Sequence, residues 1–328
     1  MGKLGYVLVA VIVAVGLVFG FAGPSAAKPV KFKAVAFLPV NKVDVKGFRM
    51  FIDMVNKKFK NYINIDLIGG PEVTPPFQLH EAVRKGVIDM TQTSCCYYPS
   101  LLWEAQAGMF TNTTRQERYE TDFHKTMTDL HAGVGLTWLG NSSFNQTFHL
   151  YTNKPVKKLA DFKGLKIRVF PAFIPLMKTL GAVPINLPMG DIYTAMERGT
   201  VDGFVMTHFG FVTDFSWHEV TKYVIDYDLY QGAAYILANP KKWNKIPADV
   251  REQIKAFKKN VTNNEVAKFF ANTSDERWKL MLSKGVKPLK FSPSGGKKFL
   301  EIAYEAAWDN VIKKSPELGP KLKKMLVK

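Results

Sequence analysis

Apolar residues in the first third of the chain change their spacing several times. They alternate with polar residues over 29–37 and 63–67, as they do in half-buried strands. Between these two runs they recur every three or four residues over 48–59, which predicts an amphipathic helix. A second helix over 76–85 and a short strand over 87–90 continue the alternation. Strands that alternate with helices predict a parallel sheet with crossover helices.

The same order of elements returns in the middle of the chain. Strands are predicted over 165–170, 183–187 and 201–203, and helices over 171–181 and 191–199. This second alternation predicts another α/β unit of the same kind.

One local match links the two units. The segment AVRKGVID, which starts at Ala82, parallels AMERGTVD, which starts 113 positions later at Ala195. This spacing is too long for a solenoid repeat and fits two similar lobes. A chance match is the alternative, because a helix, a glycine and a strand in succession are common in α/β proteins.

Two crossings between the lobes are expected. Strand-like residues over 148–151 mark the first crossing, and a second crossing is expected around 230–238. After it, 248–284 is predicted to be a long helical stretch, with Pro247 before it and Gly285 after it.

The first 27 residues have the features of an export signal. Lys3 precedes an uncharged apolar stretch over 4–22, and small residues follow up to Ala27. A positive start, an apolar middle and a small-residue site predict a signal peptide over 1–27 that is cleaved after Ala27. A retained membrane anchor is the alternative, because about 20 apolar residues span a bilayer.

The composition adds a strong basic charge to this picture. The chain has 328 residues, of which 47% are hydrophobic and 22% charged, so disorder and a polytopic membrane protein are excluded. The formal net charge of +17 favours anionic ligands. Nucleic-acid binding is not expected, because the chain is predicted to be exported and lacks interleaved basic and aromatic motifs.

Familiar catalytic motifs are missing from the sequence. It contains no G-x-S-x-G, H-E-x-x-H, P-loop or G-x-G-x-x-G pattern, and its six histidines are scattered. We therefore expect neither an enzyme nor a protein with a cofactor or a metal. An exported chain with two α/β lobes is expected to bind a ligand between them, at the carboxyl ends of the strands.

The two cysteines, Cys95 and Cys96, are adjacent and follow the first-lobe strand that is expected to end near Met90. Two cysteines are too few for a disulfide scaffold. In an oxidising compartment they could form a vicinal disulfide, although adjacent Cα atoms lie only about 3.8 Å apart and the peptide would be strained. Two free, partly buried thiols are the favoured alternative.

Several motifs occur together in one known family. They are NKPV at 153–156, LADFKGLKIRV at 159–169, GAVP at 181–184 and VRKGVIDM at 83–90. This combination resembles the solute-binding proteins of tripartite ATP-independent periplasmic (TRAP) transporters, the DctP family. The resemblance covers nearly all of the chain after the predicted signal peptide and is strongest over 153–203.

The resemblance implies a periplasmic-binding-protein-like α/β fold with two lobes, a ligand cleft between them and a long helix that spans both. Lobe I is expected over 28–148 plus about 236–275, and lobe II over 149–235 plus about 276–328. A monomeric periplasmic protein is expected. It would deliver an organic anion to the integral-membrane subunits of the transporter.

Arg168 is the residue expected to hold the ligand. The resemblance implies this role, because the matching arginine of the family pairs with the substrate carboxylate. A guanidinium also offers a rigid fork that fits a carboxylate with two parallel hydrogen bonds. An arginine on the surface of a strand would be the alternative if Arg168 stood alone.

Two departures from the family pattern bear on the substrate. Met206 replaces an asparagine that often touches the ligand, and Phe148 stands where sialic-acid-binding members carry a second arginine. Both exchanges replace polar contacts by apolar ones, which predicts a monocarboxylate with an apolar or aromatic tail. A small sulfonate or a hydroxy acid is the alternative ligand, and a ligand-sensing module for a signalling receptor is the alternative function.

The other expected contacts lie at strand ends or among nearby aromatic residues. Strand ends face the cleft in α/β proteins, which points to the residues after the first-lobe strand. In addition to Arg168, Phe148 and Met206, the expected binding residues are Asn145, Phe170, Phe209, Thr93, Ser94, Cys95 and Tyr97.

Overall fold

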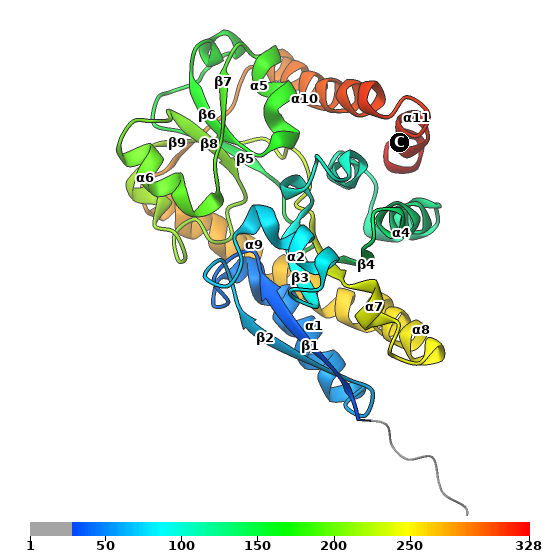
Figure 1. Ribbon diagram of the computed structural model, residues 1–328. Coiled ribbons are helices and arrows are strands. Elements are labelled where there is room, and N and C mark those ends of the chain that lie inside the picture. The colour runs from blue at the N-terminus through cyan, green and yellow to red at the C-terminus, as the bar shows by residue number, and fades with distance from the viewer. Residues whose placement is uncertain (1–27) are drawn as a thin grey trace, which may run out of the picture.

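The computed structural model describes residues 28–328, which form two α/β lobes (Figure 1). Each lobe is built on one sheet, of five strands in lobe I and six in lobe II. The predicted signal peptide, 1–27, lies outside the described residues. Among the helices that the structure describes, none is long and apolar enough to cross a bilayer.

The sheet of lobe I has the strand order β2-β1-β3-β10-β4. Strand β1 pairs in parallel with β2 and β3, whereas β10 is antiparallel to β3 and β4. The strands are β1 (Val30–Ala36), β2 (Ile63–Gly69), β3 (Met90–Ser94), β4 (Thr137–Asn141) and β10 (Ala234–Ala238).

The sheet of lobe II has the strand order β11-β9-β5-β8-β6-β7. Strand β6 pairs in parallel with β7 and β8, whereas β5 is antiparallel to β8 and β9. The strands are β5 (His149–Thr152), β6 (Lys166–Val169), β7 (Val183–Asn186), β8 (Gly203–Met206), β9 (Tyr223–Ile225) and β11 (Lys287–Leu289).

The two sheets repeat one topology, as the match between the two units predicted. The order β2-β1-β3-β10-β4 in lobe I corresponds to β7-β6-β8-β5-β9 in lobe II, with the same parallel and antiparallel pairs. Only β11, at the edge of lobe II, has no counterpart in the sheet of lobe I. The repeat is therefore structural, and the local sequence match between the two units is not due to chance.

Helices flank both sheets (Figure 1). The first helix shows how its position is determined: its apolar face places Phe48, Phe51 and Val55 in the core of lobe I, while its lysines remain outside. The helices are α1 (Lys46–Lys58), α2 (Leu79–Lys85), α3 (Arg115–Tyr119), α4 (Phe123–Gly133), α5 (Ile174–Thr179), α6 (Ile192–Glu197), α7 (Pro240–Trp243), α8 (Ala248–Phe257), α9 (Asn263–Ser283), α10 (Pro293–Lys314) and α11 (Gly319–Leu326).

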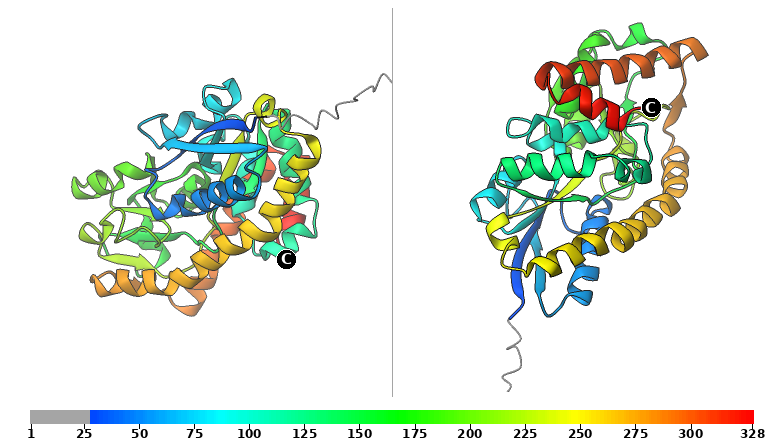
Figure 2. Two further views of the ribbon diagram at one scale, coloured as in Figure 1. Left: turned by 90° about the horizontal axis from the view of Figure 1, so that it is seen from below. Right: turned by 90° about the vertical axis from the view of Figure 1, so that its right-hand side faces the viewer.

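The predicted long helix is confirmed and runs along both lobes (Figure 2). Helices α8 and α9 are continuous through one π-helical segment, Lys258–Thr262. On the lobe I side Lys258 donates a hydrogen bond to the carbonyl oxygen of Asn141 (2.6 Å). On the lobe II side the ring of Trp278 lies 4.9 Å from that of His149.

The chain crosses between the lobes through two hinge segments, 142–148 and 226–233. They pair with each other, since the Phe148 N–H donates to the carbonyl oxygen of Tyr230 (3.0 Å) and the Gly232 N–H to that of Gln146 (2.6 Å). Because of these crossings, β10 completes the sheet of lobe I only after the chain has built most of lobe II.

Two boundaries differ from the sequence-based expectations. The strands predicted at 87–90 and 201–203 start later, at Met90 and Gly203, because a turn first carries the chain away from the preceding helix.

The C-terminal helix α11 lies against lobe I, where the carbonyl oxygen of Leu326 accepts hydrogen bonds from the Asn112 N–H (3.2 Å) and the Thr111 hydroxyl (2.8 Å). These hydrogen bonds attach the C-terminal end of the chain to the segment 111–112.

Candidate functional site

A small cavity of about 40 Å³ lies between the two lobes, at the hinge segments. Its walls combine aromatic and methionine side chains with a few polar ones. A volume of this size holds one or two water molecules. The lining residues are Phe37, Asp44 and Ser94 from lobe I, Phe170, Met189, Met206 and Thr207 from lobe II, and Ser143, Gln146, Phe148 and Gly232–Ala234 from the hinge segments and the start of β10.

Arg168 lies on β6, directly behind two residues that line this cavity. Its side chain is fully buried. Nη1 lies 3.7 Å from the sulfur of Met206, and the guanidinium carbon lies 4.1 Å from the ring centre of Phe170. The guanidinium is therefore a fixed cation in contact with two residues that line the cavity.

The hydrogen bonds of Arg168 leave part of its fork free. Nε donates to the carbonyl oxygen of Leu187 (2.9 Å) and Nη1 to that of Val205 (3.4 Å), while Nη2 has no partner among the described residues. No carboxylate in residues 28–328 forms an ion pair with it. A buried Nη2 without an acceptor is a costly arrangement, and an incoming carboxylate would satisfy it.

Burial dominates the electrostatics of this cation. Loss of solvent lowers the pKa of Arg168 to about 10, and the nearby Tyr97, Cys96 and, most weakly, Asp191 act in the opposite direction. Burial likewise raises the pKa of Tyr97 to about 12. Arg168 is therefore charged and Tyr97 neutral at neutral pH, so the site has a net positive charge at its centre.

Tyr97 connects the two lobes beside this cation. Its ring lies 6.1 Å from that of Phe37 in lobe I and 5.8 Å from that of Phe170 in lobe II, measured between centroids. Aromatic contacts of this geometry hold the lobe faces together without covalent links.

The cavity also collects polar atoms that have no partner. Oδ2 of Asp44, Nε2 of Gln146 and Oγ1 of Thr207 are buried, and none has a hydrogen-bond partner in the described part of the chain. Such groups are rare in folded proteins, and their convergence on one cavity is typical of a ligand site.

The expected binding residues divide into two groups. Phe148, Phe170, Met206 and Ser94 line the cavity, and Arg168 and Tyr97 lie directly behind it. The structure places the other four expected residues away from the lining, namely Thr93, Cys95, Asn145 and Phe209.

Each of these four residues has a different environment. Phe209 packs in a separate cluster, with its ring 5.2 Å from that of Phe270 on α9. Asn145 donates from Nδ2 to the carbonyl oxygen of Ala267 (3.3 Å), and it adopts a positive φ of 56° in the first hinge segment. Thr93 and Cys95 are fully buried in lobe I.

Three lining residues were not expected from the sequence, namely Asp44, Gln146 and Thr207. A usable signal was present for Asp44, because it follows β1 and the carboxyl ends of parallel strands face the ligand site. Thr207 follows β8 in the same way, directly after Met206. Gln146 lies in a hinge segment, whose position no local pattern predicts.

Cys95 and Cys96 are free thiols in this structure. Their sulfur atoms are 4.0 Å apart, and Sγ of Cys96 lies 3.3 Å from the sulfur of Met109. Burial raises the pKa of Cys95 well above its usual value. The pair is therefore a buried part of the lobe I core without a disulfide, which agrees with the favoured alternative.

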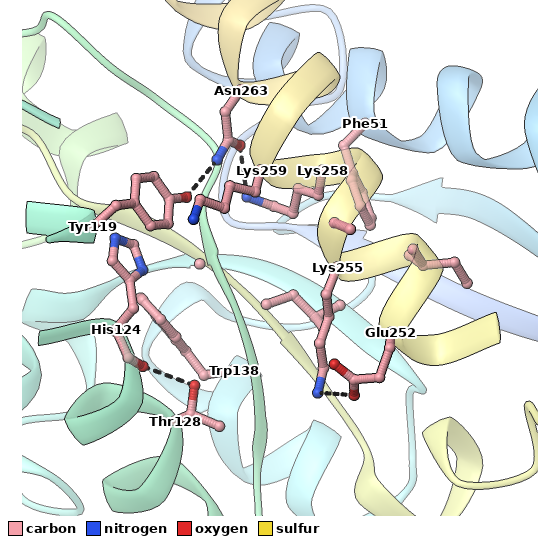
Figure 3. Close-up of a pocket in the computed structure, with 14 residues that line it drawn as sticks. Phe51, Tyr119, His124, Thr128, Trp138, Glu252, Lys255, Lys258, Lys259 and Asn263 are labelled. Atoms are coloured by element: carbon pink, nitrogen blue, oxygen red, sulfur yellow. Dashed lines mark hydrogen bonds and ion pairs between the residues drawn. The ribbon is translucent and has the colours of Figure 1, made fainter. Parts of the chain in front are cut away.

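A larger pocket, of about 330 Å³, lies on lobe I between α4 and α8 (Figure 3). Lys258 extends along it and donates to Oδ1 of Asn263 (2.9 Å), whose Nδ2 donates to the hydroxyl of Tyr119 (2.9 Å). The rings of Tyr119 and His124 stack with centroids 3.8 Å apart. Lys258, Asn263 and Tyr119 are thus linked by hydrogen bonds. The pocket is lined by lobe I and the long helix alone, so it does not join the two lobes.

Similar lobes that meet at the ends of their strands, around a cavity, are the architecture of the periplasmic binding proteins. Within that class the chain belongs to the DctP family, described as "Bacterial extracellular solute-binding protein, family 7", whose family model matches residues 35–315. The resemblance to TRAP solute-binding proteins is therefore confirmed.

Related proteins match this chain over different lengths. The C4-dicarboxylate-binding periplasmic protein DctP of Rhodobacter capsulatus is 24% identical over 321 residues, which are 93% of this chain and 91% of that protein. A monocarboxylate 2-oxoacid-binding periplasmic protein of a Nostoc species is 27% identical over 46% of this chain and 42% of its own length. An uncharacterized protein of Haemophilus influenzae is 29% identical, and the match spans 35% of its length.

Solved structures confirm the two-lobed fold. A TRAP solute-binding protein from Desulfovibrio salexigens with bound orotic acid has a TM-score of 0.81 at 19% identity, over 90% of this chain and 97% of that one. The solute receptor DctP7 of Bordetella pertussis, which binds pyroglutamic acid, has a TM-score of 0.80 at 16% identity, over 90% and 98%.

Proposed function

We propose that this chain captures an organic acid between its lobes through Arg168 and delivers it to the membrane subunits of a TRAP transporter. The observation that carries the proposal is the buried guanidinium of Arg168, which has a free Nη2 and no carboxylate partner within residues 28–328. A fixed cation behind an interlobe cavity fits a ligand carboxylate, which would supply the missing acceptor. On this proposal the chain is a transport component and not an enzyme.

The bound molecules of similar proteins support an acid as the common feature. Solved TRAP solute-binding proteins hold orotic acid, pyroglutamic acid, L-gulonate and succinate, respectively. These molecules differ in size and polarity, but each contains a carboxyl group. The carboxylate is the part that a buried arginine recognises, and the remaining walls would select the rest of the molecule.

The walls of this cavity favour a ligand with an apolar part. Phe37, Phe148, Phe170 and Met206 line it, and no arginine is among the lining residues in the described part of the chain. Apolar walls reward burial of apolar ligand surface at about 25 cal/mol per Å². We therefore propose a monocarboxylate with an apolar or aromatic tail, and sugar acids fit these walls less well.

A thermal-shift screen with paired ligands tests this function. Phenylacetate, phenylpyruvate, pyroglutamate, succinate and L-gulonate would each be compared with no ligand, and phenylacetate also with phenylacetamide, which keeps the ring but lacks the charge. We expect the monocarboxylates with apolar parts to raise the melting temperature by several degrees, since a ligand at 100 times its Kd adds about 2.7 kcal/mol. Phenylacetamide should have no effect.

Two results would contradict the proposal at different levels. Stabilisation by succinate or gulonate alone would refute the apolar tail but keep acid capture. Equal stabilisation by phenylacetate and its amide would refute recognition of the carboxylate by Arg168.

A further inference from the structure

Asp44 is the one ionisable side chain among the described residues that line the interlobe cavity. It lies in a short 3-10 turn, Val43–Val45, just after the carboxyl end of β1. Its side chain is 7% exposed, and Oδ2 has no hydrogen-bond partner in residues 28–328. A buried, unpartnered carboxyl oxygen that borders a ligand cavity needs a functional or chemical explanation.

The surroundings of Asp44 offer no positive charge to stabilise a carboxylate. No ion pair involving it occurs in the described part of the chain, and the nearby charge that acts on it is that of Asp214, from the segment after β8. Oδ2 of Asp214 accepts the Val43 N–H (2.7 Å), and Lys42 donates to the carbonyl oxygen of Asp214 (2.5 Å). Burial and the like charge raise the pKa of Asp44 to about 7.

Neutral groups face Asp44 from the other elements around the cavity. From β3, Gln92 donates from Nε2 to the carbonyl oxygen of Asp44 (2.9 Å) and to Oγ of Ser142 (2.9 Å). The hinge segments contribute Gln146, and the residue after β8 is Thr207. The guanidinium of Arg168 contacts Phe170 and Met206, and it forms no ion pair with Asp44.

An organic anion that enters this cavity meets a second acidic group. Two carboxylates in one buried site cannot both stay ionised at low cost, so one of them holds a proton. The ligand carboxylate faces Arg168 and remains charged, and the proton therefore goes to Asp44. A protonated carboxyl group changes from an acceptor into a hydrogen-bond donor.

We propose that capture of the organic anion is coupled to the uptake of one proton by Asp44, which then donates a hydrogen bond to an oxygen of the ligand. The inference rests on the proposed function and adds a proton to it. Solvent supplies the proton, so the complex gains one negative charge from the ligand and one positive charge from the proton. Binding leaves the net charge of the protein unchanged.

The coupling predicts how affinity depends on pH. Above pH 7 Asp44 is ionised in the ligand-free protein, and each further pH unit should weaken binding about tenfold, since one proton must be taken up. Below about pH 6 the group is already protonated, and affinity should become constant. Capture would therefore be favoured in mildly acidic surroundings.

Calorimetric titration with pyroglutamate and phenylacetate tests the coupling, because both carboxyl groups stay ionised between pH 6 and 9. At pH 8, buffers of different ionisation enthalpy should reveal an uptake of about one proton per ligand. Asp44→Asn keeps a donor but cannot titrate, so its binding should take up no proton and its affinity should not change between pH 6 and pH 8. Asp66→Asn, an exposed aspartate on β2, is the matched control and should behave as wild type.

A ligand-free measurement separates this inference from the proposed function. The melting temperature of Asp44→Asn relative to wild type should rise between pH 5.5 and 8.5, since only the wild type must then bury a carboxylate. Lys258 also titrates in this range, but it is present in both proteins and cancels in the difference.

Three results would overturn the coupling. They are a wild-type affinity that does not change between pH 6 and 9, a loss of affinity at pH 6 in Asp44→Asn as large as in Asp44→Ala, and a flat difference in melting temperature. If neither acid binds at any pH, the proposed capture of organic acids is itself refuted, and a rising difference in melting temperature would still show where Asp44 titrates.

Discussion

At the scale of single residues, the site is organised around an arginine that the protein itself does not neutralise. Burial removes water from the guanidinium of Arg168. In its place the guanidinium donates hydrogen bonds to two carbonyl oxygens and packs against the ring of Phe170. Burying a charge without a partner is expensive, so this arrangement trades stability for ligand binding. The same trade applies to Asp44, which faces the cavity without a partner.

Replacing Arg168 by methionine should therefore cost the ligand-free protein little. Loss of two hydrogen bonds is offset by removal of the desolvated charge, and we expect the free energy of unfolding to change by no more than about 1 kcal/mol. Urea denaturation of Arg168→Met and wild type measures this. A loss of 3 kcal/mol or more, about what breaking a buried ion pair costs, would show that Arg168 has an internal partner.

The sequence predicted the cation of this site but not its polar companions. Arg168 stands inside a long family motif, Phe170 follows it two residues later, and Met206 is the last residue of β8. Asp44 and Gln146 come from a turn and from a hinge segment, and they reach the cavity only through the packing of one lobe on the other. Phe209 and Asn145 lie three residues from Met206 and Phe148, respectively, yet both contact the long helix instead of the cavity.

At the scale of elements, one turn occurs twice with the same hydrogen bonds. Gly86 and Gly199 end their helices with φ of 76° and 66°, a conformation that glycine adopts without strain. Three residues later an aspartate accepts a backbone N–H from the neighbouring strand. Asp89 does so from Lys33 (2.9 Å) and Asp202 from Lys166 (3.0 Å).

Both aspartates should therefore stabilise their lobes to a similar extent. In Asp89→Ala and Asp202→Ala one strand N–H loses its acceptor, and we expect each to lower the free energy of unfolding by about 1–2 kcal/mol. Denaturant unfolding measures the effect, with the exposed Asp66→Ala as control. A change below 0.3 kcal/mol in either lobe would show that the repeated turn is not a stabilising element.

The long helix carries a second buried cation, at its π-helical segment. Burial lowers the pKa of Lys258 to about 7, although its ammonium group donates to Asn141 and Asn263. A lysine whose pKa is lower in the folded state than in the unfolded state holds fewer protons when folded. Stability should therefore rise with pH above 7, up to the ordinary lysine pKa of about 10.4.

Comparison with Lys258→Met isolates this contribution. Between pH 7.5 and 9.5 the wild type should gain about 1.4 kcal/mol per pH unit relative to the variant, since one proton separates the two states. Urea unfolding at three pH values measures this, and Lys255→Met, an exposed lysine of α8, should show no such trend. Parallel profiles for wild type and Lys258→Met would contradict a neutral Lys258.

Element positions were largely predictable, and element edges were not. The apolar residues of β1 and α1 are spaced as they are because they face the core. Both elements were therefore predicted to within about two residues. The starts of β3 and β8 were placed too early because the apolar residues after Gly86 and Gly199 belong to the turn. The edge strand β11 was missed because its three residues carry no pattern.

At the scale of the whole molecule, two paired hinge segments and one helix hold the lobes together. The cavity between them has room for about one or two water molecules, which is far less than an organic acid needs. A ligand can therefore enter only when the lobes separate or their facing side chains move. Hinge motion about the segments 142–148 and 226–233 is the simplest route.

Separation of the lobes should be visible in solution. We expect small-angle X-ray scattering to give a larger radius of gyration without ligand than this structure has, and a smaller one when phenylacetate or pyroglutamate is present. Succinamide, which is uncharged, should leave it unchanged. An equal radius of gyration in all three conditions would contradict closure on the acid.

The most direct test of the account is a calorimetric titration of Arg168→Lys with the acid that stabilises the wild type most. Lysine keeps the positive charge but cannot form two parallel hydrogen bonds, so a buried charge pair should lose about 2–5 kcal/mol, which is about 30-fold to several thousand-fold in affinity. Arg115→Lys, on α3 outside the interlobe cavity, should bind as the wild type does. If Arg168→Lys binds within threefold of the wild type, this arginine does not hold the carboxylate and the account is wrong.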